Sequence, residues 1–150
     1  MKPIYFLLTV LAFAKCTTKQ LDVSQIDFKA DACFGSCPIF AMTILNDGTA
    51  NYDAKLYNER EGQFTTIIRK PQLDSLLAYI LNANLFSLKD NYSILATDHP
   101  TYTLTVKLKN GKRKTIEDYG PIGPENLKKI YTLIFSLRET QDWKDAAHTS

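Results

Sequence analysis

The chain has little of what metal sites, catalytic sites and membrane spans are built from. Its 150 residues include only three cysteines, two histidines and one tryptophan. No apolar run reaches the roughly 20 residues that a membrane-spanning helix needs. A zinc site needs about four soft or imidazole ligands, and besides the cysteines only His99 and His148 are present. We therefore expect no metal and no other cofactor. No serine lies in a nucleophile elbow either.

The chain also lacks an excess of charge of one sign. It has 18 lysine and arginine side chains against 16 aspartate and glutamate side chains, and removal of residues 1–15 would leave 16 of each. A balanced surface offers no electrostatic footprint for nucleic acid. Lys19 and Lys29 are too few for a polybasic membrane patch. We therefore expect no nucleic-acid partner.

The N-terminus contains a leader for export. Lys2 precedes an almost unbroken apolar run of eleven residues, 4–14, which suits the core of a secretory signal. Residues 12–14 fit the small-x-small pattern of ordinary signal peptidase. Cys16, followed by polar residues 17–20, resembles the lipid-accepting cysteine of a bacterial lipoprotein.

Two cleavage sites therefore remain open. Phe13 and Lys15 occupy positions where a lipoprotein signal prefers small residues, yet we favour lipidation of Cys16. On this interpretation residues 1–15 are a signal peptide of lipoprotein type and residues 16–24 a tether, and the protein is a periplasmic or outer-membrane lipoprotein of the cell envelope, attached to the membrane through its N-terminal lipid. The alternative is a soluble secreted or periplasmic protein.

Cys33 and Cys37 predict a sharp turn. Four extended residues would hold their Cα atoms roughly 13 Å apart, whereas a disulfide needs about 4.4–6.8 Å. Gly35 and Pro38 suit such a turn. A thioredoxin-type redox pair has two intervening residues at a helix N-terminus, but here three intervene and a strand follows. We predict a structural disulfide, formed in an oxidising compartment.

Alternating apolar residues predict strands near residues 25–30, 39–45, 50–56, 62–68 and 102–108. A further strand is expected after residue 111, with Ile116 as its one clear apolar residue. Register decides the length of two hairpin loops. A three-residue loop at 46–48 pairs Ile44 with Ala50, and one at 109–111 pairs Leu104 with Ile116, whereas two-residue turns would mix the apolar and polar faces. Both loops place a glycine, Gly48 or Gly111, where we expect a left-handed conformation.

Two amphipathic helices complete the prediction. One begins near Pro71 and the other near Glu125, and each carries apolar residues at helical spacing. The order of elements predicts an α+β domain, with an antiparallel sheet of about six strands and both helices packed on one face. We expect a single domain over residues 25–142 and a flexible tail at residues 143–150.

Several unusual short motifs occur in one order along this domain. These motifs are Ala32-Cys33-Phe34-Gly35-Ser36-Cys37-Pro38, Asn46-Asp47-Gly48-Thr49, Leu85-Phe86-Ser87-Leu88, Thr97-Asp98-His99-Pro100 and Asp118-Tyr119-Gly120 with Gly123-Pro124. Over residues 25–140 the chain resembles a family of small bacterial envelope proteins, domain-of-unknown-function family 6438. The resemblance implies an exported single domain, often lipid-anchored, and implies no activity.

The candidate site residues are Asp98, His99, Asp118 and Tyr119. Asp98 and His99 could form half of an acid–base pair, with Asp118 or Tyr119 completing a ligand groove. A Thr-Asp-x-Pro run is more often a turn held by the aspartate side chain, and the glycines and prolines of residues 118–124 favour a rigid link. We therefore expect a non-catalytic binding or structural protein of the envelope, whose partner is a protein or a small molecule. The alternative is a small periplasmic hydrolase or inhibitor-type module that uses these two loops.

Overall fold

The structure is a computed structural model that describes residues 22–146. The predicted signal peptide, Cys16, most of the predicted tether and His148 lie outside the described residues. The elements in chain order are β1 (Val23–Ala30), β2 (Phe40–Leu45), β3 (Thr49–Ala54), β4 (Gly62–Ile67), α1 (Lys70–Ala83), a short 3-10 helix (Leu85–Ser87), β5 (Asn91–Ser93), β6 (Thr101–Leu108), β7 (Arg113–Tyr119), α2 (Glu125–Thr140) and β8 (Lys144–Asp145). Within residues 22–146, no helix is both long enough and apolar enough to cross a bilayer.

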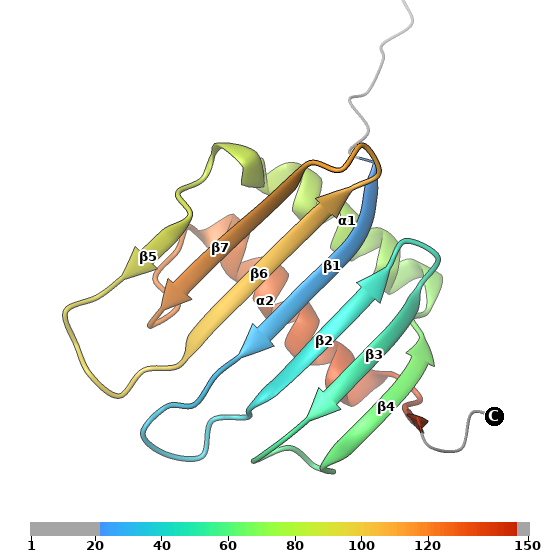
Figure 1. Cartoon of the computed structure of the whole chain (residues 1–150), viewed down its shortest axis with the longest axis horizontal. Helices are drawn as coiled ribbons and strands as arrows, with labels where there is room; N and C mark the ends of the chain where they lie inside the picture. Colours follow the sequence, from blue (N-terminus) through green and yellow to red (C-terminus); the bar gives the residue numbers. More distant parts are fainter. Residues whose placement is uncertain (1–21, 147–150) are drawn as a thin grey trace, which may run out of the picture.

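The strands form one sheet in the order β5-β7-β6-β1-β2-β3-β4-β8 (Figure 1). The sequence predicts about six antiparallel strands, and this count is wrong. The sheet has eight strands, and it is mixed because β5 runs parallel to β7. The two additional strands are the edges, with only three and two residues. Such short segments carry no alternation of their own, so only their neighbours in the folded domain determine that they are strands.

Both predicted hairpin registers are confirmed. Ile44 pairs with Ala50 across the first loop, and Leu104 pairs with Ile116 across the second. Gly48 and Gly111 have φ angles of 91° and 83°, in the left-handed region. A residue with a side chain would be strained in this conformation. The two glycines therefore stabilise three-residue loops, and the loop length sets which side chains of the following strand face the core.

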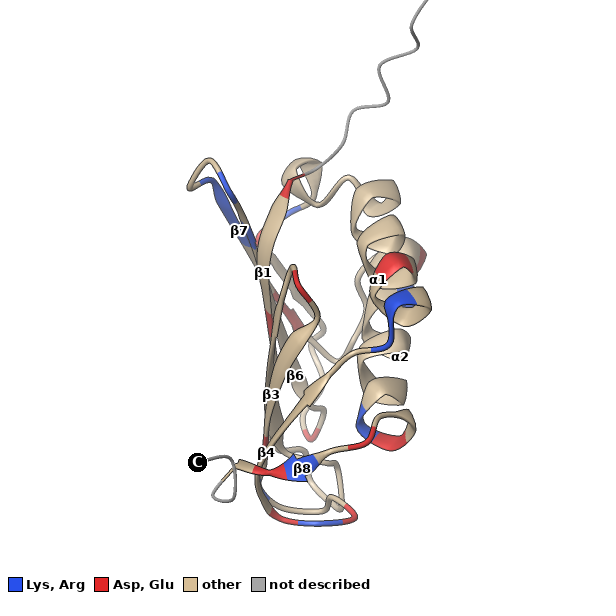
Figure 2. Ribbon diagram, turned by 90° about the vertical axis from the view of Figure 1, so that its right-hand side faces the viewer, with Lys and Arg blue, Asp and Glu red and all other residues tan. Residues whose placement is uncertain are grey.

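The helices α1 and α2 both pack on one face of the sheet, as predicted (Figure 2). The hydrophobic core lies between these two layers. It is formed by alternate strand residues such as Phe28, Met42 and Val106 together with helix residues such as Leu76 and Ile134. The opposite face of the sheet carries the other half of each alternation and is mostly polar, with residues such as Asp27, Thr43 and Thr105.

The ordered domain extends further than the predicted boundary at residue 142. Trp143 is buried, and its indole Nε1 donates a hydrogen bond of 3.1 Å to the carbonyl oxygen of Leu137 in α2. Lys144 and Asp145 then pair with β4 as β8. Residues 143–145 of the predicted tail are thus part of the fold, and residues 147–150 lie outside the described residues.

The chain enters the sheet at one end, and most of its long connections lie at the other. β1 begins at Val23, and because β1, β3, β5 and β7 all end where β2, β4 and β6 begin, the connections 31–39, 55–61, 94–100 and 120–124 lie at the opposite end (Figure 1). We call these four segments the apex loops. They carry five exposed large apolar side chains, Phe34, Leu56, Tyr57, Leu95 and Ile122.

Candidate functional site

The disulfide turn is the first of the apex loops. Cys33 and Cys37 form the predicted disulfide, with their Cα atoms 5.7 Å apart. Gly35 has a φ angle of 141° at the centre of the turn. The backbone N–H of Phe34 donates a hydrogen bond of 3.3 Å to the carbonyl oxygen of Asp98, and this bond ties the turn to the loop 94–100. The side chain of Phe34 remains exposed.

Three of the four predicted site residues lie close together. Asp98 has a φ angle of 73°, and its carboxylate accepts a hydrogen bond of 3.0 Å from the hydroxyl of Thr97. The backbone N–H of His99 donates a hydrogen bond of 3.4 Å to the Tyr119 hydroxyl, and the two rings stand edge to face at 6.2 Å. These contacts connect the loop 94–100 to the end of β7.

Asp118 lies apart from this group. Successive strand residues point to opposite faces, so Asp118 faces the helices while Tyr119 faces the open side of the sheet. The Asp118 carboxylate is fully buried and accepts hydrogen bonds from the backbone N–H groups of Ile122, at 2.9 Å, and Gly123, at 3.1 and 3.2 Å. A Cβ atom at Gly123 would lie 2.7 Å from Asp118 Oδ2. Asp118 therefore organises the loop that leads into α2.

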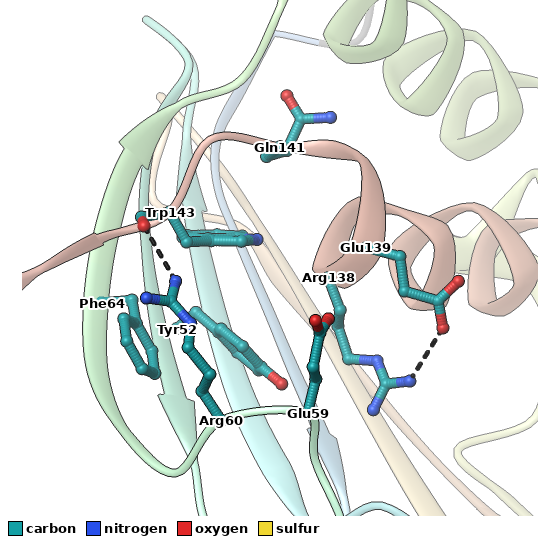
Figure 3. A pocket seen from close by; sticks show the side chains of 8 residues that line it. All are labelled: Tyr52, Glu59, Arg60, Phe64, Arg138, Glu139, Gln141 and Trp143. Carbon is teal, nitrogen blue, oxygen red and sulfur yellow. Dashed lines mark hydrogen bonds and ion pairs between the residues drawn. The ribbon is translucent and has the colours of Figure 1, made fainter.

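A cavity of about 400 Å³ lies elsewhere, at the C-terminal end of α2 (Figure 3). We call it the Arg138 pocket. Its lining comes from the strands β3 and β4, from the loop between them, from the last turn of α2 and from the segment after it: Tyr52, Glu59, Arg60, Phe64, Arg138, Glu139, Gln141 and Trp143. The volume lies within the range of small-molecule sites, about 300–1,000 Å³.

One wall of the Arg138 pocket is aromatic. The rings of Tyr52 and Trp143 lie 5.1 Å apart, and those of Tyr52 and Phe64 lie 5.9 Å apart. The guanidinium of Arg60 lies over the Phe64 ring, 4.5 Å from its centroid, and donates a hydrogen bond of 3.0 Å to the carbonyl oxygen of Trp143. This bond closes the pocket by joining the β3–β4 loop to the segment after α2.

Arg138 is a largely buried cation with weak compensation. Its side chain is 13% exposed and lies 5.1 and 5.2 Å from the rings of Phe40 and Phe135. Its only carboxylate within ion-pair distance among residues 22–146 is Glu139, at 3.3 Å, whose own side chain is 70% exposed. In addition, Nε of Arg138 is buried and has no hydrogen-bond partner in this part of the chain. Burying such a charge costs free energy unless a partner neutralises it.

Asn58 holds the pocket in shape. Its side-chain oxygen accepts hydrogen bonds of 2.8 Å from both the Tyr52 hydroxyl and Nη1 of Arg138. Its side-chain nitrogen donates to the carbonyl oxygens of Ile39 and Leu56, at 2.9 and 3.0 Å. Partial burial raises the pKa of Tyr52 despite the opposing charge of Arg138, so the hydroxyl stays protonated and donates. The β3–β4 loop is thereby fixed against α2.

The sequence from residue 24 to residue 138 matches the model of a family described as Domain of unknown function (DUF6438). The chain belongs to this family. The resemblance drawn from the short motifs is thus confirmed. No curated protein matches the sequence. Within the described residues, no three His, Cys, Asp or Glu side chains are grouped as they would be around a metal ion.

No motif in the sequence points to the Arg138 pocket. The one available signal was Trp143, the single tryptophan of the chain, placed just after an amphipathic helix. Arg60 and Arg138 belong to a loop and a helix end that no motif connects. Their proximity follows from the length of α2 and from the path by which the chain returns to β4.

Proposed function

We propose that this protein is a non-catalytic binding domain of the bacterial cell envelope, anchored by a lipid on Cys16, and that the Arg138 pocket is its binding site. The observation that carries the proposal is the pocket itself. It combines an aromatic wall, a preorganised loop and a buried, weakly compensated guanidinium. A buried polar group without a full set of partners is a feature that a ligand can complete.

The position of the pocket agrees with an N-terminal anchor. The six residues 17–22 between Cys16 and β1 span at most about 20 Å, and the eight residues of β1 add about 27 Å. The loop with Glu59 and Arg60 lies at the far end of the sheet from the start of β1 (Figure 1). A domain tethered in this way presents the pocket away from the membrane.

The geometry favours binding over hydrolysis. Asp118 is buried and its carboxylate is engaged by two backbone N–H groups, so it is not available for proton transfer at the loop of Asp98 and His99. His99 contacts Tyr119 and does not line the Arg138 pocket. The pocket is therefore lined by charged and aromatic side chains that can bind a ligand, and its lining contains no histidine that could act in an acid–base pair.

Anchoring is tested by expressing the full chain with its leader in a bacterial host. We expect the protein in the membrane fraction and a mass for the N-terminal peptide that corresponds to a diacylglyceryl-modified Cys16. The variant Cys16→Ser should lose both. A soluble product cleaved after Ala14 would overturn the anchoring half of the proposal.

Binding is tested with a panel of amino acids, carboxylates, phosphates and sugars. Trp143 lines the pocket and is the only tryptophan, so its fluorescence reports occupancy directly. We expect at least one class to change the fluorescence of the wild-type protein and to lose affinity in Arg60→Gln. If no class does so, the Arg138 pocket is not the binding site.

A further inference from the structure

We propose that the Arg138 pocket binds a zwitterionic amino acid or short peptide with an aromatic or large apolar side chain. This inference rests on the proposed function and narrows its ligand to one chemical class. It follows from three features of the pocket: the arrangement of its four charges, the nature of its aromatic wall and its rigidity.

The charges of the pocket form two balanced pairs. Glu59 and Arg60 come from the β3–β4 loop, and Arg138 and Glu139 come from α2. A purely anionic ligand would meet two carboxylates, and a purely cationic ligand would meet two guanidinium groups. Since complementary charge decides which partner is accepted, the ligand that suits this pocket carries both an ammonium group and a carboxylate.

The guanidinium groups are suited to a ligand carboxylate. Arginine presents a planar fork of donors that matches the two carboxylate oxygens. Arg60 has no carboxylate within ion-pair distance among residues 22–146, and its only hydrogen bond there is to a carbonyl oxygen. Arg138 has only the exposed carboxylate of Glu139. A ligand carboxylate would thus compensate charge that the protein itself leaves nearly unpaired.

The carboxylates are suited to the ligand ammonium group. Glu59 makes no ion pair and no side-chain hydrogen bond within the described residues, and in Figure 3 its carboxylate points into the space beside Arg138. Glu139 lies on the other side of Arg138 and has a mostly exposed side chain. Both oxygens of Glu59 therefore remain available to accept hydrogen bonds from a ligand.

The aromatic wall selects the ligand side chain. Tyr52, Phe64 and Trp143 line the pocket, but they pack on one another and are only 6%, 3% and 7% exposed. A ligand side chain therefore contacts only the small part of these rings that the pocket leaves open, and aromatic pairs gain about 0.5–1.5 kcal/mol beyond the burial of their area. The four hydrogen bonds of Asn58 hold Tyr52, Arg138 and the β3–β4 loop in place before a ligand arrives. Little ordering is left for binding to bring about, which favours affinity for a small ligand.

The first experiment titrates the full mature protein with L-phenylalanine and follows the fluorescence of Trp143. N-acetyl-L-phenylalanine, which lacks the ammonium group, and L-phenylalaninamide, which lacks the carboxylate, are titrated alongside. Because a charge-assisted hydrogen bond is worth at least a factor of ten in affinity, we expect each blocked analogue to bind at least tenfold more weakly. Equal binding of the three compounds would overturn the inference.

The second experiment uses variants of exposed residues, so that folding is preserved. Glu59→Gln and Arg60→Gln should each raise the Kd for L-phenylalanine about tenfold. Glu61→Gln is the matched control, since Glu61 lies in the same loop but does not line the pocket, and it should leave the Kd unchanged. Equal weakening by Glu59→Gln and Glu61→Gln would show a general charge effect and overturn the inference.

Failure of this inference can be told apart from failure of the proposed function. If L-phenylalanine gives no response up to about 10 mM while another class in the panel binds and depends on Arg60, only the ligand class is wrong. If no compound in the panel binds, both proposals fall.

Discussion

Asp118 provides the sharpest test of how this fold is held together. Asp118 is a charged residue that is fully buried within the described domain. Its carboxylate accepts hydrogen bonds from the N–H groups of Ile122 and Gly123. These two groups belong to the loop that directs the chain from β7 into α2. Replacing Asp118 by alanine would leave both N–H groups without their acceptor.

The cost can be estimated from the burial of the two donors. An unsatisfied buried donor costs about 1–3 kcal/mol. Gly123 is buried, whereas Ile122 is exposed and its N–H can find water. We therefore expect Asp118→Ala to lower the free energy of unfolding by about 1–3 kcal/mol and, at roughly 3 °C per kcal/mol for a domain of this size, to lower the Tm by about 3–9 °C. Asp118→Asn should cost less, because its side-chain oxygen can still accept from both groups.

The assay is urea unfolding followed by far-ultraviolet circular dichroism. Asp142→Ala serves as the control, because Asp142 is exposed and its side chain makes no hydrogen bond or ion pair within residues 22–146. Its free energy of unfolding should change by less than about 0.5 kcal/mol. A cost below about 1 kcal/mol for Asp118→Ala, or equal costs for the alanine and asparagine variants, would refute the assignment of Asp118 as the acceptor that orders this loop.

Three further predictions concern other contacts. Cys33→Ser and Cys37→Ser should each lower the free energy of unfolding by about 2 kcal/mol, the chain-entropy value for a five-residue loop, and the double variant should lose little more; unequal losses in urea would contradict a purely structural disulfide. Burial and then the nearby Asp118 carboxylate raise the pKa of Tyr131, yet the Tyr131 hydroxyl makes no well-formed hydrogen bond within the described chain. Tyr131→Phe should therefore change the free energy of unfolding by less than about 1 kcal/mol, and a larger loss in the same assay would show that the hydroxyl bonds to Asp118. For Asp27, partial burial opposes ionisation, but hydrogen bonds from neighbouring side chains outweigh it and hold the pKa below its ordinary value of 3.8. The stability that this carboxylate contributes is therefore present above pH 3.8 and lost as the pH falls through the folded-state pKa. The free energies of unfolding of the wild type and Asp27→Asn should thus differ near neutral pH and converge in acid. A difference that stays constant with pH would show that the ionised form of Asp27 does not stabilise the fold.

Regular alternation and glycine placement were enough to predict the centre of the sheet. Ile44 and Ala50 could be paired from the sequence because any other loop length would have mixed apolar and polar faces, and the same reasoning applied to Leu104 and Ile116. These are local constraints, since each involves one loop and its two flanking strands. The two helices followed in the same way from their apolar stripes.

The edge strands could not be predicted, because their structure depends on distant partners. β5 is a strand only because the end of β7 lies beside it, and β8 only because Phe64 and Thr65 of β4 are available for pairing. Asp118 and Tyr119 were predicted to line one groove, but their side chains lie apart. Side chains alternate along β7, so these two neighbouring residues lie on opposite faces of the sheet.

The Arg138 pocket extends beyond the end of the region that matches the family. The family match ends at residue 138, so Tyr52, Arg60 and Arg138 lie within it, while Trp143 lies in a segment for which the sequence predicts a flexible tail. The tryptophan nevertheless packs on α2 and accepts the Arg60 hydrogen bond through its carbonyl oxygen. The matched region therefore supplies both guanidinium groups, and the segment beyond it supplies one aromatic face. Truncation at residue 138 would remove Trp143 and Glu139 from the pocket and leave both arginines, Tyr52 and Phe64 in place, so the proposed site is completed only by residues beyond the matched region.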